Sequence, residues 1–470
     1  MNAATTATSS QRLAAFAADL RFADLPTEVV DHMKVCLLDT LGCGLYGSTL
    51  PWTRIVLDTV SAVDGGGPCP VWGSTARLSS PHAALVNGTA VHAFELDDLH
   101  PRSIVHPGSV VAPAALAVSA MGGKVSGRDL LVALVAGYEV AARAGSTMGA
   151  AHLLAGWHPT GTHGTLGAAA AAGSVLGLSS TEMAHAIGTA GSQSSGLMAS
   201  QFGAMVKRLN AGHAAQSGVY ASMLAQRGFT GIADLFDSEY GGYLSTFSPT
   251  SDPTWTTAGL GSTWEVLNVG FKPYSTNGSC HASIDALLDL RRTEGVRAQD
   301  VESVRVRCSS ATFHHVGWDY VPDSVTTAQM NLSYIVAVVL TDGDAFVDQF
   351  TPERIIDPAL VELASRVHVS PDPDIDARGD TARHCTHLEL HLHDGRVLSQ
   401  DREYARGSAR SPLEVDDVVE KFRRLSAKAI DDDQAEDLRR LVDRLEDVDD
   451  VRSLTDLLVA RAPHISRSHR

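Results

Sequence analysis

The sequence predicts a mainly α-helical protein, with a large all-helical domain built from both chain ends and a smaller inserted α/β domain that forms a lid. Apolar residues recur at helical spacing through the first half, alternate as in β-strands further on, and return to helical spacing near the C-terminus. The chain has 470 residues, whereas an average domain has roughly 150. We therefore expect residues 1–268 and 406–470 to form the helical domain and residues 269–405 the lid.

Helices are expected throughout the first half of the chain. Residues 29–47 and 126–145 carry apolar side chains at helical spacing, and both stretches end at glycine. Ser126 is a suitable N-cap for the second stretch, while Ser179 and Glu182 form a capping-box pattern before a further helix.

Two segments are unusually rich in alanine and glycine, residues 165–178 and 211–228. Small residues at three- and four-residue spacing let helix backbones approach closely. These segments predict a densely packed bundle, and no regular alternation of strands and helices is visible around them.

The pattern changes after about residue 263. Residues 265–275 and 301–310 alternate as half-buried strands do, and residues 386–400 indicate a hairpin that turns at Asp394-Gly395. Residues 326–343 predict one helix between these strands. From residue 411 onward the chain is predicted to be helical again and to rejoin the first domain.

Composition and charge exclude several functional classes. The net charge is −17 and no basic stripe is present, so we expect no nucleic-acid partner. The longest apolar runs are shorter than the roughly 18 residues of a membrane span, and the N-terminus lacks a secretory signal pattern. Six cysteines without a CxxC pair indicate reduced thiols, and we expect a cytoplasmic protein.

Acidic and basic residues are concentrated between residues 95 and 106, just before a predicted helix start at Pro107-Gly108. Such clustering beside a buried helix indicates a pocket wall where protons are transferred. An ordinary polar loop with a helix cap is the alternative. The cluster consists of Glu95, Asp97, Asp98, His100, Arg102 and His106.

Five blocks, taken in order, resemble the MmgE/PrpD family, whose members include 2-methylcitrate dehydratase, cis-aconitate decarboxylase and iminodisuccinate epimerase. The resemblance implies a homodimer, an active site in the cleft between helical domain and lid, and cofactor-free acid–base chemistry on small carboxylates. The blocks are NGTAVHAFELDDLHP with VHPGSVVAPAALA, GWHPTGTHGTLGAAAAA, MVKRLNAGHAAQSGVYASMLAQRGFTG, FKPYSTNGSCHASIDALLDL and ARGSARSPLEVDDVVEKFRRLS.

Four residues are candidates for the chemical step. His106 and His158 match family histidines and titrate near neutral pH, so each is suited to moving one proton. Asp98 matches one half of a family Asp pair and is chosen over Asp97 to orient a histidine or lysine. Lys207 matches the family lysine and is expected to meet a substrate carboxylate, with Asp98 or Glu95 as the structural alternative.

Further residues are expected to contact the substrate. Glu95 stands where decarboxylase and epimerase members carry Asp, and Asn277 stands where the decarboxylase has His. His163 is either a substrate-selecting group or a core histidine, and Arg208 either assists Lys207 or faces solvent. The expected substrate-contacting set is Glu95, Arg102, His163, Lys272, Asn277, His281 and Tyr334.

Two other patterns have simpler explanations. Residues 161–167 have glycine spacing that resembles a dinucleotide fingerprint, but no strand precedes them. His387, Glu389, His391 and His393 alternate on one face of a strand, and a solvated outer face of the lid sheet is favoured over a metal site. We therefore expect neither a metal nor an organic cofactor.

The sequence favours a cofactor-independent lyase that removes a proton α to a carboxylate of a small polycarboxylate, with dehydration as the first choice. Epimerisation needs the same proton abstraction and is the alternative, and a catalytically inactive binding protein is a third possibility. Glu95, Leu99, Asn277 and a loop one residue longer before His106 predict that cis-aconitate is a poor substrate.

Overall fold

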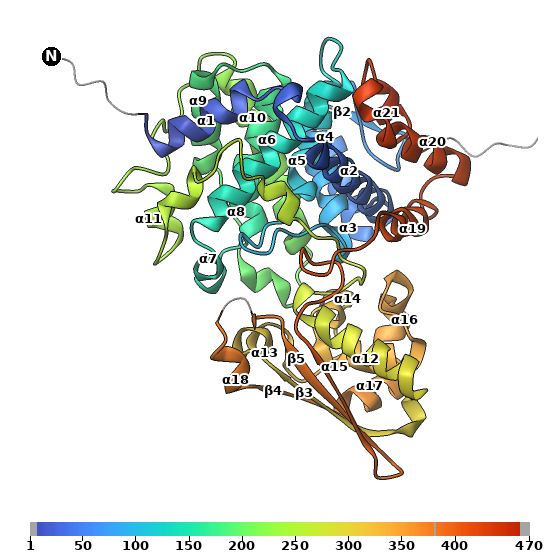
Figure 1. Ribbon diagram of the computed structural model, residues 1–470. Helices are drawn as coiled ribbons and strands as arrows, with labels where there is room; N and C mark the ends of the chain where they lie inside the picture. Colours follow the sequence, from blue (N-terminus) through green and yellow to red (C-terminus); the bar gives the residue numbers. More distant parts are fainter. Residues whose placement is uncertain (1–6, 380–381, 461–470) are drawn as a thin grey trace, which may run out of the picture.

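The structure is a computed structural model that describes residues 7–379 and 382–460. Helices dominate it, and a small sheet lies at one end (Figure 1). The prediction of a mainly helical protein with strands in its C-terminal part is confirmed, and the sheet there is small and mixed. The helices preceding the sheet region are α1 (Ser9–Asp19), α2 (Thr27–Ser48), α3 (Pro51–Ser61), α4 (Ser80–Val91), α5 (Gly108–Ser119), α6 (Gly127–Ser146), α7 (Ala150–Leu154), α8 (Pro159–Val175), α9 (Ser180–Ser192), α10 (Val206–Ala225) and α11 (Tyr243–Phe247).

The expected helix starts are present. Ser126 accepts a hydrogen bond from the Asp129 backbone N–H at 3.1 Å and caps α6. Ser179 and Glu182 form the reciprocal capping box of α9. Helix α2 covers the first predicted stretch, residues 29–47. Local sequence therefore determines where these helices begin.

Helices α8 and α10 cross at very short range. A Cβ atom added at Gly218 would lie 2.5 Å from the Cβ of Ala168, and one added at Gly212 would lie 2.2 Å from the Leu85 carbonyl oxygen in α4. Only glycine fits at such crossings. The densely packed bundle predicted from the small residues is confirmed, and residues 161–167 lie inside α8 rather than in a phosphate-binding loop.

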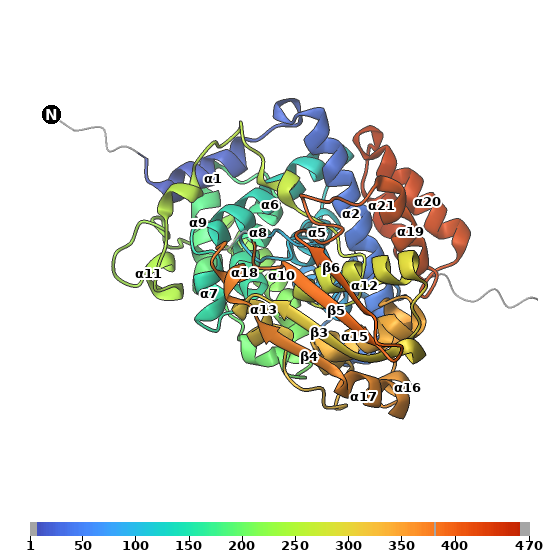
Figure 2. The ribbon, with the colours of Figure 1, turned by 60° about the horizontal axis from the view of Figure 1, so that its bottom comes forward.

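The sheet is mixed, with strand order β4-β3-β5-β6 (Figure 2). Strand β3 pairs in parallel with β4 and antiparallel with β5, and β5 forms the predicted hairpin with β6. Helices α12 and α15 pack against the sheet. The four strands are β3 (Val301–Cys308), β4 (Val367–Pro371), β5 (Thr386–Leu392) and β6 (Val397–Arg402), and the two-residue strands β1 (Cys69–Pro70) and β2 (Arg77–Leu78) pair elsewhere.

Two predicted elements of the sheet region differ from the structure. Residues 265–268 form a 3₁₀ helix. Residues 269–275 form no strand: Gly270 makes only an isolated bridge to Leu99, and the Phe271 N–H donates to the Gly407 carbonyl oxygen. The single helix expected over 326–343 is divided, since Asn331 caps a new helix. The helices here are α12 (His281–Glu294), α13 (Ser310–Val316), α14 (Val325–Gln329), α15 (Leu332–Asp342), α16 (Pro352–Ile355), α17 (Pro358–Ser365) and α18 (Pro373–Asp376).

The C-terminal helices return to the first helices of the chain. Figure 1 shows α19 (Val415–Ser426), α20 (Asp432–Asp443) and α21 (Arg452–Asp456) beside α2. Lys421 of α19 is buried, and its Nζ lies 2.6 Å from Asp39 Oδ1 of α2 and 2.5 Å from the Leu96 carbonyl oxygen. The last helices thus hold the segment that follows α4.

The six cysteines are buried free thiols, as expected. Within residues 7–379 and 382–460, no helix combines the length and the apolar character that a membrane span requires.

Candidate active site

The polar segment predicted to form a pocket wall follows directly after α4. A 3₁₀ turn over His92–Phe94 extends that helix, and Glu95 then adopts a left-handed backbone conformation with φ 57°. Ile104, further along the segment, has φ 56°. Among the described residues these are the two non-glycine positions with positive φ, and both line the same pocket. Backbone strain of this kind is concentrated at functional sites.

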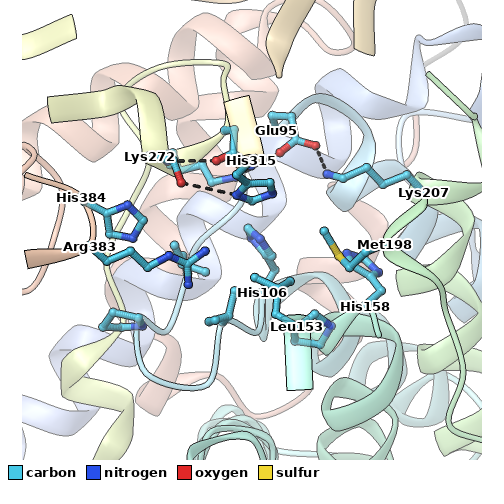
Figure 3. A pocket seen from close by; sticks show the side chains of 17 residues that line it. Glu95, His106, Leu153, His158, Met198, Lys207, Lys272, His315, Arg383 and His384 are labelled. Atoms are coloured by element: carbon cyan, nitrogen blue, oxygen red, sulfur yellow. Dashed lines mark hydrogen bonds and ion pairs between the residues drawn. The ribbon is translucent and has the colours of Figure 1, made fainter. Parts of the chain in front are cut away.

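This pocket has a volume of about 60 Å³ and lies between the helices and the sheet region (Figure 3). Charged and imidazole groups face its interior from both sides. Its lining comprises Glu95, Leu99, Pro101, Ile104, His106, Leu153, His158, Pro159, Met198, Lys207, Lys272, Asn277, Gly278, Ser279, His315, Arg383 and His384.

Glu95 lies among three buried cations. Its Oε1 binds both Lys207 Nζ and Arg208 Nη1, and Lys272 Nζ lies 3.6 Å from Oε2. Burial opposes ionisation of this carboxyl, but the three cations hold its pKa well below the usual range. Burial lowers the pKa of Lys207 to about 8, although Glu95 opposes that shift. With Asp97 included, three cations face two carboxylates, so the site favours binding of a further anion.

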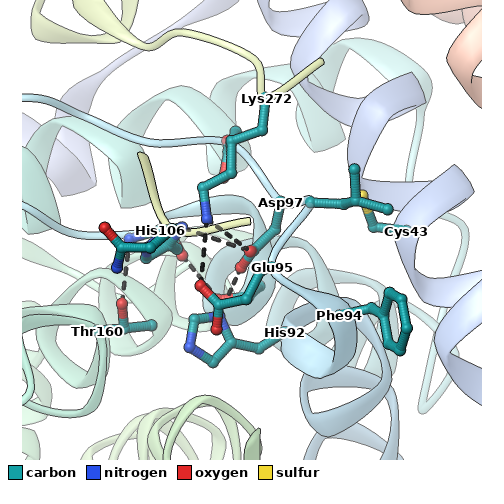
Figure 4. A network of polar contacts seen from close by, with 12 residues as sticks. Cys43, His92, Phe94, Glu95, Asp97, His106, Thr160 and Lys272 are labelled. Carbon is teal, nitrogen blue, oxygen red and sulfur yellow. Dashed lines mark hydrogen bonds and ion pairs between the residues drawn. The ribbon is translucent and has the colours of Figure 1, made fainter. Parts of the chain in front are cut away.

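Asp97 lies between two imidazoles (Figure 4). His92 Nδ1 is 2.6 Å from Asp97 Oδ2, and His106 Nδ1 is 3.4 Å from Oδ1. Lys272 Nζ lies 4.0 Å from Oδ1. Burial raises the pKa of Asp97, but His106 and His92 outweigh it and lower that pKa below its ordinary value.

His106 is held as a neutral base. Burial lowers its pKa to about 3, although Asp97 opposes the shift. Its backbone N–H donates to Thr160 Oγ1 at 3.2 Å, which fixes the residue before α5. His158 is the N-cap residue of α8, as expected from the following proline, and burial also lowers its pKa. Both imidazoles can accept a proton at neutral pH.

Asp98 is not part of the pocket lining. Its carboxyl accepts hydrogen bonds from Tyr138 Oη at 2.7 Å and from the Gly108 backbone N–H at 3.0 Å. Burial, with Asp39 nearby, raises the pKa of Asp98 well above its usual range. As expected, one Asp of the pair caps a helix and the other contacts histidines. The residues are the reverse of the prediction: Asp97 contacts the imidazoles, and Asp98 accepts from the first N–H of α5.

Two further candidates also lie outside the pocket. Arg102 stacks over the ring of Trp255 at 3.7 Å and donates to the Ser146 carbonyl oxygen. His163 is buried in α8, where its Nδ1 lies 3.1 Å from Tyr243 Oη. For His163, the alternative of a core histidine therefore describes its surroundings.

His281 and Tyr334 are likewise directed elsewhere. His281 Nε2 lies 3.3 Å from the Thr276 carbonyl oxygen, and its ring packs edge-on against Tyr274. The hydroxyl of Tyr334 donates to the Gln349 carbonyl oxygen at 2.8 Å. Asn277 does line the pocket, but its Oδ1 accepts from the Ser279 N–H, which reduces its capacity to bind a ligand.

Two family models match consecutive parts of the chain. A model of the MmgE/PrpD N-terminal domain matches residues 11–256, and a model of the MmgE/PrpD C-terminal domain matches residues 274–447. The chain belongs to the MmgE/PrpD family.

Relatives in this family align along nearly the whole chain. A cis-aconitate decarboxylase-like protein of Aspergillus oryzae is 34% identical over 460 residues, which cover 94% of this chain and 95% of that protein. The cis-aconitate decarboxylase of Aspergillus terreus is 30% identical over 463 residues, covering 94% of each chain. The human cis-aconitate decarboxylase is 31% identical over 455 residues, covering 94% of this chain and 93% of the human protein.

In this MmgE/PrpD protein several groups in or next to the pocket were not expected from the sequence. His92 adjoins the cluster in the chain, and Arg208, left open between two roles, is buried against Glu95. The remaining three come from the sheet region. Strand β3 ends beside the start of β5, where Cys308 pairs with Thr386, so residues just after β3 and just before β5 share one sheet edge. These residues are His315, Arg383 and His384.

One group in the described ranges has metal-ligand spacing, namely His92, Asp97 and His106, whose ligand atoms lie within 4.8 Å of one another. The direct 2.6 Å contact of His92 with Asp97 and the nearby Lys272 ammonium favour a hydrogen-bonded network over cation binding. On strand β5, by contrast, His387 and His391 face Glu389 in partly exposed ion pairs, which agrees with a solvated outer face.

Proposed function

We propose that this protein is a cofactor-independent lyase that transfers a proton at a carbon next to a carboxylate of a small polycarboxylate. One observation carries the proposal: a buried cluster with excess positive charge adjoins an imidazole that burial keeps neutral. The cluster neutralises substrate charge, and a neutral imidazole is the form that removes a proton.

Each group has a definite part in this proposal. Lys207 and Lys272 bind substrate carboxylates, and Arg208 holds Glu95 beside them. His106 moves the proton, and Asp97 positions its ring and stabilises the imidazolium that forms. His158, on the same pocket, is placed to serve as the complementary acid or base.

Decarboxylation is the reaction we favour, because the relatives carry the names cis-aconitate decarboxylase and cis-aconitate decarboxylase-like protein. In that reaction carbon dioxide leaves and the vacated substrate carbon takes up a proton from solvent, relayed through His106 or His158. Dehydration is the second candidate, since the same base removes an α-proton and a β-hydroxyl then leaves as water. Epimerisation would use the same abstraction followed by reprotonation on the other face.

We further propose that cis-aconitate itself is a poor substrate. Glu95, Leu99 and Asn277 line the pocket, and each replaces the residue expected in the decarboxylase. Glu95 is one methylene longer than Asp, Leu99 offers no hydrogen bond, and Asn277 does not titrate. Displacing reacting groups by about 1 Å can lower a rate about 10²-fold.

The test is to incubate the purified protein in D₂O with cis-aconitate and, separately, with 2-methylcitrate, after dialysis against a chelator. Carbon dioxide release, water loss and deuterium at the α-carbon are followed by NMR. Incorporation of deuterium from D₂O into either compound or its product supports proton transfer. The identity of the product distinguishes decarboxylation from dehydration. Activity lost to the chelator and restored by one metal would contradict cofactor independence.

Two results would change the conclusion. Turnover of cis-aconitate at about 1 s⁻¹ or faster would contradict the reading of the three pocket positions. Absence of exchange with every small polycarboxylate tested, in protein that still binds them, would favour the catalytically inactive binding protein.

We also propose a homodimer. One face of α10 carries side chains that are unusually apolar for a surface, including Val206, Tyr220 and Leu224, and Phe229 follows it. A second copy of the chain would cover this stripe. Light scattering should give twice the 49.6 kDa chain mass, and Tyr220→Glu should reduce it to one chain.

A further inference from the structure

A second, larger cavity adjoins the pocket described above. Its volume is about 390 Å³, against about 60 Å³ for the inner pocket. Leu153, Met198, His315 and Arg383 line both cavities and therefore mark the passage between them. The inner pocket is the smaller of the two, so a ligand with a chain beyond its carboxylates would extend outward through this passage.

The outer cavity presents apolar groups from both parts of the chain. Leu153 and Leu154 of α7 and Met198 lie on the helical side, while Ala311 and Ile375 lie on the sheet side. Leu154 remains 75% exposed, which is unusual for a leucine next to a cavity. Apolar surface left open beside a polar site is typical of a ligand-binding groove.

The apolar character continues into the inner pocket. Leu99 and Ile104 form part of its wall. Ile104 is β-branched and adopts φ 56°, an unfavourable conformation that hydrogen bonds hold in place: its N–H donates to the His100 carbonyl, and the His100 N–H donates to Val105. The strain keeps an apolar side chain in the pocket wall.

The outer cavity offers no excess positive charge for a second anionic group, because Asp376 offsets Arg383 in its lining. Asp376 lines it, and its carboxylate accepts hydrogen bonds from the Ser310 N–H at 2.8 Å and the Ser310 hydroxyl at 2.5 Å. This carboxylate would repel a ligand carboxylate placed beside it. The lysines of the site line the inner pocket instead.

We propose that the outer cavity is a subsite for an aliphatic chain attached to the substrate. The substrate is then a polycarboxylate with an alkyl substituent: its carboxylates occupy the inner pocket, and its chain passes Leu153 and Met198. This inference rests on the proposed carboxylate-binding function and specifies the substrate class of that site.

The test is calorimetric binding of succinate, methylsuccinate, butylsuccinate and hexylsuccinate to the intact protein. These probes share two carboxylates and differ only in chain length. Burying a methylene strengthens binding by up to about fourfold, so we expect the Kd to fall about two- to fourfold for each added methylene. A Kd independent of chain length would overturn the subsite, whereas failure of succinate and all homologues to bind would overturn the carboxylate site itself.

Variants of the cavity lining then show where the aliphatic chain of the ligand binds. Ala311→Phe should fill the outer cavity and abolish the dependence on chain length while leaving succinate affinity unchanged. Ala62→Phe, at an exposed position after α3, is the matched control and should leave the whole series unchanged. Leu154→Glu, at the exposed rim, provides a second variant should Ala311→Phe fail to fold, and it should weaken hexylsuccinate binding selectively. Retention of the full chain-length dependence in a folded variant of either kind would contradict the proposal.

Discussion

Asp97 and Asp98 are neighbours in the chain, yet their carboxyl groups have opposite properties. Asp97 faces His92, His106 and Lys272, and these groups lower its pKa. Asp98 is buried and faces the Asp39 carboxyl, and these two effects raise its pKa although Tyr138 and the Gly108 N–H donate hydrogen bonds that oppose the rise. Only the ionised member can stabilise an imidazolium, and for that reason we place Asp97 in the mechanism.

Replacing His106 tests the proton-transfer role. His106→Ala should lower kcat by roughly 10²–10⁴-fold with a modest change in KM, because a general base acts in the transition state. His391→Ala, on the partly exposed face of β5, is the matched control and should leave both constants near those of the wild type. Near-normal kcat in His106→Ala would transfer the role to His158.

Lys207 should give the enzyme an alkaline limit. Burial lowers its pKa from 10.5 to about 8, so the ammonium that binds a substrate carboxylate is present below pH 8 and is lost as the pH rises through that value. We expect KM to increase by about tenfold per pH unit above 8, as for loss of a single proton.

Lys207→Arg provides the control for this pH profile. Its guanidinium stays charged throughout, so the alkaline increase in KM should disappear even if KM is higher overall. Identical pH profiles for Lys207→Arg and the wild type would assign the titration to another group.

The sequence indicates some site residues but not others, for a geometric reason. His106 and His158 each precede a proline that starts a helix, so their position at a helix end can be inferred locally. His315 and His384 reach the pocket only through the pairing of β3 with β5. The choice between adjacent carboxyls also depends on groups distant in sequence.

At the scale of elements, capping residues in the sequence predict where helices start, whereas an apolar pattern does not show whether one helix continues unbroken. The N-cap residue Ser126 locates the start of α6 correctly, and the capping box of Ser179 and Glu182 locates the start of α9. The apolar pattern of residues 326–343 conceals a break, because Asn331 uses its Oδ1 to accept from the Tyr334 N–H and its Nδ2 to donate to the Trp318 carbonyl. The second of these contacts is not visible in a helical pattern.

The crossing of α8 and α10 predicts a strong effect of one methyl group. Gly218→Ala would place its Cβ 2.5 Å from that of Ala168 and 2.6 Å from the Ala168 carbonyl carbon, and backbone must then move. We expect a loss of roughly 1–3 kcal/mol in the free energy of unfolding, measured with urea. Gly123→Ala, where nothing lies within 4 Å, is the control and should change that free energy by less than about 0.5 kcal/mol.

For the whole molecule, the C-terminal helices return to the first helices and contact the segment that carries Glu95 and Asp97. Lys421 joins Asp39 of α2 to the Leu96 carbonyl, one residue after Glu95. Helical composition at both chain ends allows this return to be expected, but not the particular lysine that makes it. The family models match two consecutive parts of the chain, residues 11–256 and 274–447, whereas the charge contacts depend on the folded arrangement.

Removing this lysine should destabilise the entire fold. Lys421→Met leaves the buried Asp39 carboxylate without its cation, which typically lowers the free energy of unfolding by about 3–5 kcal/mol. Arg423→Met breaks an exposed ion pair of the same helix, with Glu436, and should change that free energy by about 1 kcal/mol or less. The double variant Asp39→Asn, Lys421→Met should recover part of the loss. Equal losses in Lys421→Met and Arg423→Met would contradict the stabilising role of Lys421.

The contact between Asp39 and Lys421 also has a consequence for biosynthesis. The two residues are separated by 382 positions, which at about 5–20 residues per second corresponds to roughly 20–80 s of translation. During that interval α2 and the segment after α4 are already synthesised, but the cation that neutralises Asp39 is not. Packing of α19 against α2 must therefore follow synthesis of nearly the whole chain, and the segment after α4 gains its contact with Lys421 only then.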